Sequence, residues 1–305
     1  MAKVKTFKTI FPAVSVPLND DYSINEPEFR AYLRWIKTFY GKGMDGLVCN
    51  GHTGEITGLT RAERKRVVEI CAEECGDVMT IIAGVNCENT AESIEMAKEA
   101  KEAGADGILL MPPHMWLRFG MNPDAPFEYV KDVAEGADID IIIHLYPATS
   151  KAFYPVETLI KMCKEIDHVK CIKMGTRVTS IYEHDVRLLR QECPDISLIT
   201  CHDETLCVSW FPGMDGALIG FAGCVPEIIC PAREVFANPD KHTLKEAQDW
   251  SDRIYHISQA IYGGGQPSGE AHARLKEALK QRGIFKSALM RKPVLPLNDE
   301  ELVFS

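Results

Sequence analysis

Lys173 is the residue of this chain whose type and position most strongly indicate chemistry. It lies in the segment VKCIKMG, at the end of a short apolar run that has the character of a buried strand. An ammonium group is costly there unless it is paired or deprotonated. Burial lowers the pKa of a lysine, and a neutral amine can attack a carbonyl carbon. Lys173 is therefore either a Schiff-base nucleophile or the partner of a carboxylate, whereas Lys170 is expected on the surface.

His144 and Tyr146 lie two residues apart in the segment DIIIHLY. On a strand, residues with this spacing point to the same face, so either side chain could pass protons beside an amine nucleophile. The alternative for Tyr146 is a phenol that fills the core and bonds to backbone. Both residues are candidate catalytic groups.

The segment Gly51, His52, Thr53, Gly54 combines two glycines with a hydroxyl group and precedes Glu55. This composition can turn backbone N–H groups inward as a nest for a substrate carboxylate. His52 lies in this segment and His114 follows another apolar run, and for both a packing role is as plausible as a catalytic one. All of these residues except Glu55 are candidate substrate-binding residues.

Eight short apolar runs alternate with amphipathic helical stretches up to about residue 235, which is the pattern of repeated βα units around a parallel sheet. Most of the candidate residues stand at the ends of these runs, where a (β/α) barrel places its active site. The runs are Thr9–Leu18, Gly46–Asn50, Thr80–Val85, Gly107–Met111, Asp140–Tyr146, Val169–Met174, Ser197–Cys201 and Gly216–Ala222.

The tetrapeptides GMDG, GADG and GMDG directly precede three of these runs, and their first glycine suits the end of a helix. The sequence therefore predicts an α/β fold, a (β/α)8 TIM barrel over residues 1–235, with a C-terminal helical extension over residues 236–305. An open doubly wound sheet is the alternative, but no G-x-G-x-x-G follows a run. Thr60 and Glu63 predict a capping box that opens a helix.

Composition narrows the possible partners. The formal net charge of −10 favours neither nucleic acid nor an anionic membrane surface, and no apolar run approaches the length of a membrane helix. The 11 cysteines show no C-x-x-C pair, which fits reduced thiols in a cytoplasmic protein. A small-molecule substrate is the expected partner.

These residues resemble the dihydrodipicolinate synthase and N-acetylneuraminate lyase superfamily of class I aldolases. The resemblance covers nearly the whole chain and rests on FPAVSVPLNDDYSIN, the G-x-T-G-E segment with LTRAER, the stretch GVNCENTAESIEMAKEAKEAGADGILLMPP, KCIKMG and KPVLPL. It implies that Lys173 forms an imine with a 2-oxo acid, usually pyruvate, whose carboxylate is held by the G-x-T-G-E loop. It also implies a homotetramer built as a dimer of dimers. No cofactor or metal is expected.

The chain also departs from the family. Counting back from Pro147, His144 stands where members usually carry tyrosine, and the arginine that binds a carboxylate soon after that proline is missing. Dihydrodipicolinate synthase activity itself is therefore doubtful. Asp203 with Glu204 resembles the acidic pair of the neuraminate lyase branch, although the pair could equally cap a helix. Leu218, in the eighth run, completes the candidate substrate-binding residues.

The resulting hypothesis is a Schiff-base lyase, an aldolase or hydratase-aldolase, that acts on a 2-oxo acid and releases or uses pyruvate. One alternative is a dehydratase or deaminase that works through the same lysine imine. Another is a metal-dependent hydrolase or lyase that uses the histidines with Asp203. A third is a barrel that binds a 2-oxo acid without turnover. Trp116, Phe119 and Trp210 predict either an apolar pocket or simple packing.

Overall fold

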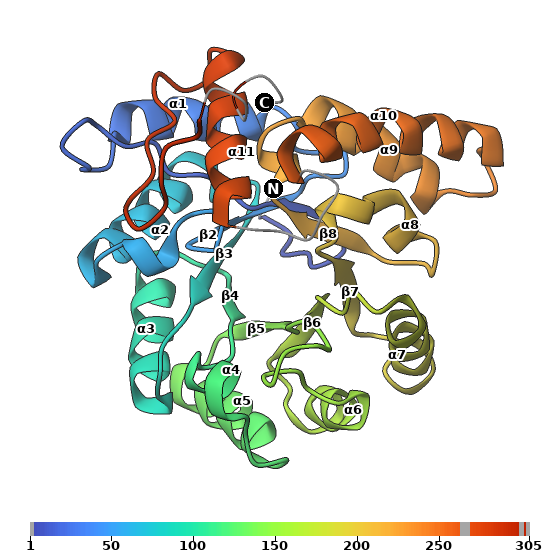
Figure 1. Ribbon diagram of the computed structural model, residues 1–305. Helices are drawn as coiled ribbons and strands as arrows, with labels where there is room; N and C mark the ends of the chain where they lie inside the picture. Colours follow the sequence, from blue (N-terminus) through green and yellow to red (C-terminus); the bar gives the residue numbers. More distant parts are fainter. Residues whose placement is uncertain (1–2, 263–268, 299–301, 303–305) are drawn as a thin grey trace.

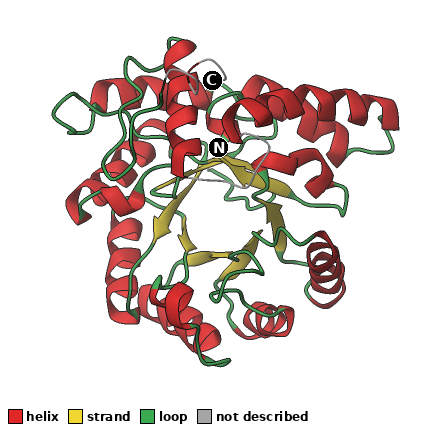
Figure 2. Ribbon diagram, in the orientation of Figure 1, coloured by secondary structure: helices red, strands yellow, loops and turns green. Residues whose placement is uncertain are grey.

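A computed structural model describes residues 3–262, 269–298 and 302 of the chain. Its central feature is a ring of eight parallel strands surrounded by helices (Figure 2). Each of the eight predicted runs contains one of the strands. They are β1 (Ile10–Pro12), β2 (Gly46–Cys49), β3 (Thr80–Val85), β4 (Gly107–Leu110), β5 (Asp140–His144), β6 (Val169–Met174), β7 (Ser197–Thr200) and β8 (Gly216–Ile219).

The sheet closes on itself. Its hydrogen-bonded order runs from β1 through β8, β7, β6, β5, β4 and β3 to β2, and a parallel bridge between Ala13 and Val48 joins the two end strands. The amide of Val14 donates to the carbonyl of Val48 across this seam at 3.0 Å. The prediction of a (β/α)8 barrel is confirmed.

Helices follow the strands and form the outer ring (Figure 1). The capping box predicted for Thr60 and Glu63 is present at the start of α2, with the side chain of each residue bonded to the backbone of the other. The helices of the barrel are α1 (Glu26–Lys37), α2 (Arg61–Cys75), α3 (Thr90–Glu102), α4 (Met115–Phe119), α5 (Ala125–Ala137), α6 (Val156–Glu165), α7 (Thr179–Glu192), α8 (Leu206–Trp210) and α9 (Pro226–Ala237).

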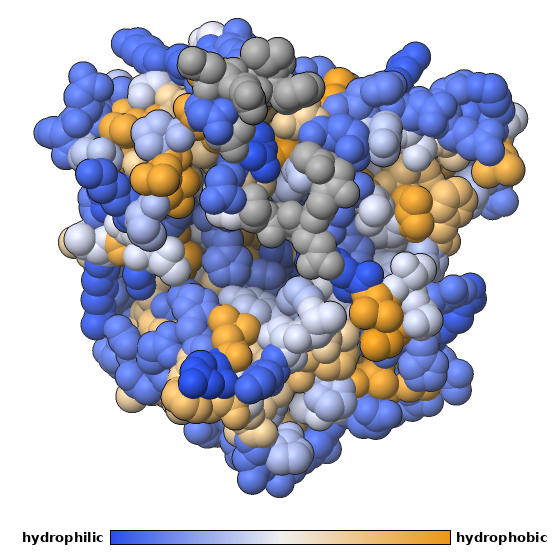
Figure 3. Space-filling view, viewed as in Figure 1, coloured by the Kyte–Doolittle hydropathy of each residue, from blue (hydrophilic) through white to orange (hydrophobic). Residues whose placement is uncertain are grey.

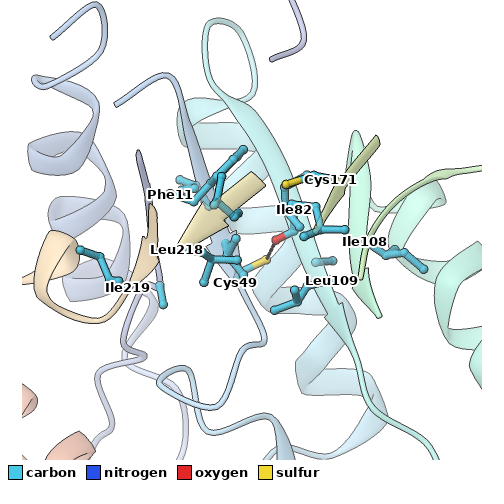
Figure 4. Close-up of a cluster of buried hydrophobic side chains, with 14 of the residues drawn as sticks. Phe11, Cys49, Ile82, Ile108, Leu109, Cys171, Leu218 and Ile219 are labelled. Carbon is cyan, nitrogen blue, oxygen red and sulfur yellow. Dashed lines mark hydrogen bonds between the residues drawn. The ribbon is translucent and has the colours of Figure 1, made fainter. Parts of the chain in front are cut away.

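The barrel interior is filled with apolar side chains. Figure 4 shows part of this core, where Phe11, Cys49, Ile82, Leu109 and Leu218 come together from different strands. The Cys49 thiol contacts the carbonyl oxygen of Ile82 at 3.6 Å. The strands therefore enclose a packed core, and any space for a ligand lies at the ends of the strands.

Two further helices follow the barrel, α10 (Leu244–Tyr262) and α11 (Gly269–Gln281). Helix α10 packs against α8, α9 and α11 (Figure 1). Helix α11 reaches the loop after β2, where Lys276 pairs with Glu55. In the part of the chain that the structure describes, no helix is both long and apolar enough to cross a membrane.

Candidate active site

A cavity of about 270 Å³ opens at the carboxyl ends of the strands. Figure 3 shows this face of the molecule hollowed near its centre, with hydrophilic residues around the hollow. The residues that line the cavity come from the strand ends, the loops after them and the two C-terminal helices. They are Ala13, Gly51, His52, Thr53, Leu109, His144, Tyr146, Pro147, Lys173, Arg177, Cys201, Asp203, Leu218, Gly220, Tyr262 and His272.

Lys173 lies on β6 and is half-buried, with its side chain on the wall of the cavity. Burial, reinforced by the charge of Arg177, lowers the pKa of its amine, while Cys201 and Asp203 act in the opposite direction. A larger share of the amine is therefore neutral, and nucleophilic, than in free lysine. Lys170 is exposed, as the sequence predicts.

His144 is the direct neighbour of Lys173 in the barrel wall. The two residues are paired in the register between β5 and β6, so their side chains point to the same face of the sheet. His144 is buried, and its Nδ1 atom finds no hydrogen-bond partner among the described residues. This places an imidazole beside the amine, where it can accept or return a proton.

Tyr146 lies beyond the last residue of β5, so the prediction that it shares a strand with His144 is met only in part. Its side chain still reaches the cavity, and the hydroxyl lies 3.3 Å from Nε2 of His52. The ring of His144 stands edge-on to that of Tyr146, with their centres 4.9 Å apart. Burial raises the pKa of the Tyr146 phenol, so the phenol keeps its proton near neutral pH.

Three histidines from different parts of the chain, His52, His144 and His272, line the cavity together with Lys173. Burial and the charge of Lys173 lower the pKa of His52 to about 3, that of His272 to about 4, and that of His144 well below its ordinary value. Near neutral pH all three rings are uncharged. They therefore add no positive charge around Lys173, and each has a ring nitrogen that can accept a hydrogen bond or a proton.

Asp203 is the acidic group of the cavity, and burial raises its pKa to about 7. The amide of Phe221 donates to its Oδ1 at 2.9 Å, and the hydroxyl of Tyr262 also interacts with it. Its neighbour Glu204 instead accepts a hydrogen bond from Arg177. Asp203 thus links the ends of β7 and β8 and does not cap α8, which begins after Thr205.

The loop after β2 offers unpaired backbone donors. Its turn is closed by bonds from Glu55 N to His52 O at 2.9 Å and from Ile56 N to Gly51 O at 3.2 Å. Within the described part of the chain, the amides of His52, Thr53 and Gly54 donate to no protein acceptor. His52 and Thr53 line the cavity together with Lys173, so their free N–H groups are a suitable place for a carboxylate.

Glycine at position 84 allows this loop to sit where it does. A Cβ atom there would lie 1.8 Å from the carbonyl oxygen of Asn50, so only a residue without a side chain fits between β3 and the start of the loop. Asn50 itself adopts a left-handed backbone and its side chain donates to the carbonyl of Arg64 at 2.9 Å. The start of the loop is therefore held by its close packing on Gly84 and by the hydrogen bond from Asn50 to Arg64.

Arg177 borders the cavity four residues after Lys173. Its guanidinium pairs with Glu204 at 2.5 Å and also lines a second, outer cavity of about 510 Å³. That larger cavity does not include Lys173 among its lining residues. We therefore place the candidate active site in the smaller cavity, with Arg177 at the boundary between the two.

The structure does not bring all predicted residues to the cavity. Gly54 is a buried residue of the loop after β2, and a Cβ atom there would lie 3.0 Å from the carbonyl oxygen of Val14. His114 precedes α4, with Nε2 3.2 Å from Asn86 and Nδ1 3.7 Å from Glu88. Neither residue lines the cavity.

The aromatic residues that suggested an apolar pocket do not line this cavity. Trp116 packs against Tyr129, Phe119 is 74% exposed, and the indole of Trp210 donates to the carbonyl of Gly216. Among residues 3–262, 269–298 and 302, no three His, Cys, Asp or Glu side chains converge as metal ligands would. The geometry thus offers no support for the metal-dependent alternative.

Sequence reasoning missed Arg177, Tyr262 and His272 as cavity residues. Arg177 follows the end of β6 closely, so extending the survey of strand ends by a few residues would have found it. Tyr262 and His272 lie on the C-terminal helices, and nothing in their local sequence indicates that they turn toward the barrel. The C-terminal helices therefore supply part of the cavity wall.

Comparison with known protein families identifies the class to which this barrel and its lysine belong. The model of the dihydrodipicolinate synthetase family matches residues 6–303. The chain belongs to this family, whose members are class I lyases that work through a lysine Schiff base. It is an enzyme of that class and, at the identities below, a divergent one.

Individual relatives agree with this assignment. The 4-hydroxy-tetrahydrodipicolinate synthase of Bartonella bacilliformis is 26% identical over 294 residues, which cover 96% of this chain and 93% of the relative. A DapA-like lyase of Thermofilum pendens is 25% identical, and the match covers 92% of this chain and 89% of the relative. The solved structure of YagE, a prophage protein of this family from E. coli K12 in complex with pyruvate, has a TM-score of 0.87 at 20% identity, covering 98% and 96%.

Proposed function

We propose that this enzyme makes or breaks the bond next to the carbonyl of a 2-oxo acid through an imine between Lys173 and a pyruvate unit. The observation that carries the proposal is the half-buried amine of Lys173, with its lowered pKa, on the wall of a cavity beside the free amides after β2. The pyruvate in the YagE complex supports the choice of ligand.

In this proposal the substrate carboxylate accepts hydrogen bonds from the amides of His52 and Thr53, and the side chain of Thr53 faces the same cavity. The carbonyl carbon then lies within reach of the Lys173 amine. Attack forms a carbinolamine, and loss of water gives a protonated imine. His144, the strand neighbour of Lys173, takes up and returns the proton during these steps.

The protonated imine then accepts electrons from the bond that breaks. In aldol cleavage the C3–C4 bond breaks as a base removes the proton of the 4-hydroxyl group, so an aldehyde leaves and an enamine remains. In dehydration the C3 proton is removed and hydroxide leaves with a proton from an acid. We assign these proton transfers to Tyr146 and His52, and the 3.3 Å contact between their side chains supports the assignment. Protonation of the enamine and hydrolysis would release pyruvate from Lys173.

Reduction with borohydride in the presence of pyruvate tests the proposal. Trapping should add a pyruvate-derived mass to the peptide that contains Lys173. The K173A variant should lose both the adduct and turnover, whereas K170A, which changes the exposed lysine of the same strand, should keep both. A K173A enzyme that still turned over substrate would contradict the proposal.

The leaving group sets the choice between cleavage and dehydration. A screen of 2-oxo acids, followed both by pyruvate release and by loss of substrate, separates these outcomes, because dehydration consumes substrate without releasing pyruvate. Pure dehydration or deamination would favour the alternative function of the same imine.

The homotetramer, a dimer of dimers in the cytoplasm, also stays a prediction carried over from the family. Light scattering on the purified enzyme measures its mass.

A further inference from the structure

We propose that Lys276 and Glu55 form a buried ion pair that positions the loop after β2 for the substrate carboxylate. Lys276, on helix α11, would then be a positioning residue. The inference rests on the proposed function, in which this loop holds the carboxylate. Beyond that function, Lys276 on the C-terminal extension would determine how accurately the loop amides are positioned for the carboxylate.

The pair joins the loop to two parts of the C-terminal segment. The Lys276 ammonium donates to Oε1 of Glu55 and, at 2.8 Å, to the carbonyl of Leu289. The other carboxylate oxygen, Oε2, accepts from the amide of Arg291 at 2.9 Å. Both oxygens of Glu55 are therefore held by residues more than two hundred positions away in the chain.

Burial makes this pair sensitive to the loss of either member. Lys276 is fully buried and Glu55 is 9% exposed. Burial lowers the pKa of Lys276, and the charge of Glu55 counteracts the shift. A buried ion pair adds little to stability compared with apolar side chains of the same volume, but it fixes one geometry, since a displaced partner would leave an unpaired charge in the interior.

The ion pair holds Glu55 in a turn with an unfavourable backbone conformation. Glu55 has φ 55° and ψ 36°, a left-handed conformation that residues with side chains adopt infrequently. The turn positions the amides of the cavity residues His52 and Thr53, which no described acceptor holds. Anchoring the side chain of Glu55 therefore holds the turn in the conformation that presents these donors.

The same helix face also reaches the cavity. His272 precedes Lys276 by four residues, so both side chains lie on one face of α11, and His272 lines the cavity together with Thr53. On the outer side, the guanidinium of Arg291 bonds to Glu63 and, at 2.7 Å, to the carbonyl of Gly58. The loop is thus bound on one side by Lys276 of α11 and on the other by Arg291 of the segment that follows this helix.

Pyruvate is the probe for this inference. The concentration dependence of borohydride trapping at Lys173 gives a half-saturating concentration and a maximal rate for each variant. In K276M, E55Q and the double variant K276M/E55Q the half-saturating concentration should rise about tenfold or more, because misplacing a binding group by an ångström can cost up to about a hundredfold. The maximal rate should stay within about threefold of wild type, because Lys173 and His144 are untouched.

The variants also separate positioning from unfolding. K276M leaves Glu55 charged and unpaired, so its melting temperature should fall, whereas K276M/E55Q removes both charges and should recover part of the loss. E55Q is isosteric and carries the test if the other variants do not fold. K280M is the matched control, because Lys280 lies one turn further on α11 and pairs with Glu277. It should trap pyruvate as wild type does.

A folded E55Q or K276M/E55Q enzyme with the wild-type half-saturating concentration would overturn the inference. So would a variant that loses maximal rate at unchanged half-saturation, because the pair would then act on chemistry and not on binding. Absence of a pyruvate adduct on the wild-type enzyme is a different result, since it would overturn the proposed function itself.

Discussion

The hydroxyl of Tyr146 lies 3.3 Å from Nε2 of His52. Tyr146 follows β5, whereas His52 belongs to the loop after β2, and both residues line the cavity. The contact therefore joins the part of the site that would hold the carboxylate to the part that contains His144 and Lys173. With the phenol protonated and the imidazole neutral, the two groups can move a proton between the bound substrate and the interior of the protein.

This contact predicts the effect of Y146F. Removing the hydroxyl should lower kcat by about a hundredfold or more, the usual scale of one acid–base group, while pyruvate trapping at Lys173 stays close to wild type. Kinetics on a substrate found by the 2-oxo acid screen, together with trapping, would measure both effects. Unchanged kcat in Y146F would assign the proton transfers to another group.

His144 should act at an earlier step. Because it is paired with Lys173 across β5 and β6, H144Q should slow formation of the imine by about a hundredfold and leave the half-saturating pyruvate concentration within about threefold. Borohydride trapping, quenched at successive times and at several pyruvate concentrations, measures the rate of imine formation and the half-saturating concentration. If H144Q instead weakened pyruvate binding and kept the maximal rate, His144 would be a binding residue.

The pKa of Asp203 predicts a pH effect. Because that pKa is raised to about 7, the carboxyl group ionises as pH rises through neutrality, and its negative charge then stabilises a protonated imine on Lys173. The amount of imine at a fixed pyruvate concentration should therefore increase between about pH 6 and pH 8. D203N should remove this step. Trapping across that pH range provides the measurement, and persistence of the step in D203N would exclude Asp203 as its source.

His272 should contribute to recognition of the substrate beyond its pyruvate unit. Its imidazole is neutral, lines the cavity and forms no side-chain hydrogen bond with a described residue. H272A should therefore lower kcat/KM for the substrate found in the screen by about tenfold, the scale of one hydrogen bond, and leave pyruvate trapping within about threefold. Equal losses in both assays would indicate a structural role.

The buried histidines predict acid sensitivity. The pKa of His202 is lowered to about 3 by burial, as is that of His52, so between about pH 6.5 and pH 4 the unfolded chain binds protons that the folded chain does not. The free energy of unfolding should thus fall as pH decreases through that window. Asp203 opposes the trend, since its raised pKa keeps a proton on the folded state.

Urea unfolding at several pH values tests this expectation. H202Q changes a buried histidine that does not line the candidate active-site cavity. The free energy of unfolding should then fall less between about pH 6.5 and pH 4, by on the order of 2 kcal/mol, because His202 no longer contributes to the pH dependence. A slope that H202Q leaves unchanged would mean that His202 takes up its proton in the folded enzyme.

Local sequence was enough to predict the barrel and to single out Lys173 as the candidate nucleophile. The eight apolar runs are short and separated by helical stretches, so the strands could be located from their composition alone. The strand end at Lys173 then followed, because parallel strands in a barrel present their carboxyl ends to one rim. The loop Gly51–Glu55 could be singled out for the same reason, as its glycines and hydroxyl are neighbours in the chain.

Other parts of the site depend on contacts between distant segments. His272 and Tyr262 reach the cavity because α10 and α11 pack over the barrel, and Lys276 meets Glu55 for the same reason. The pKa of His52 is lowered by burial and by the nearby charge of Lys173, and both effects arise only when the chain folds. Short-range composition and period thus determined the strands and the lysine, whereas tertiary packing decided which side chains surround that lysine and which of them carry charge.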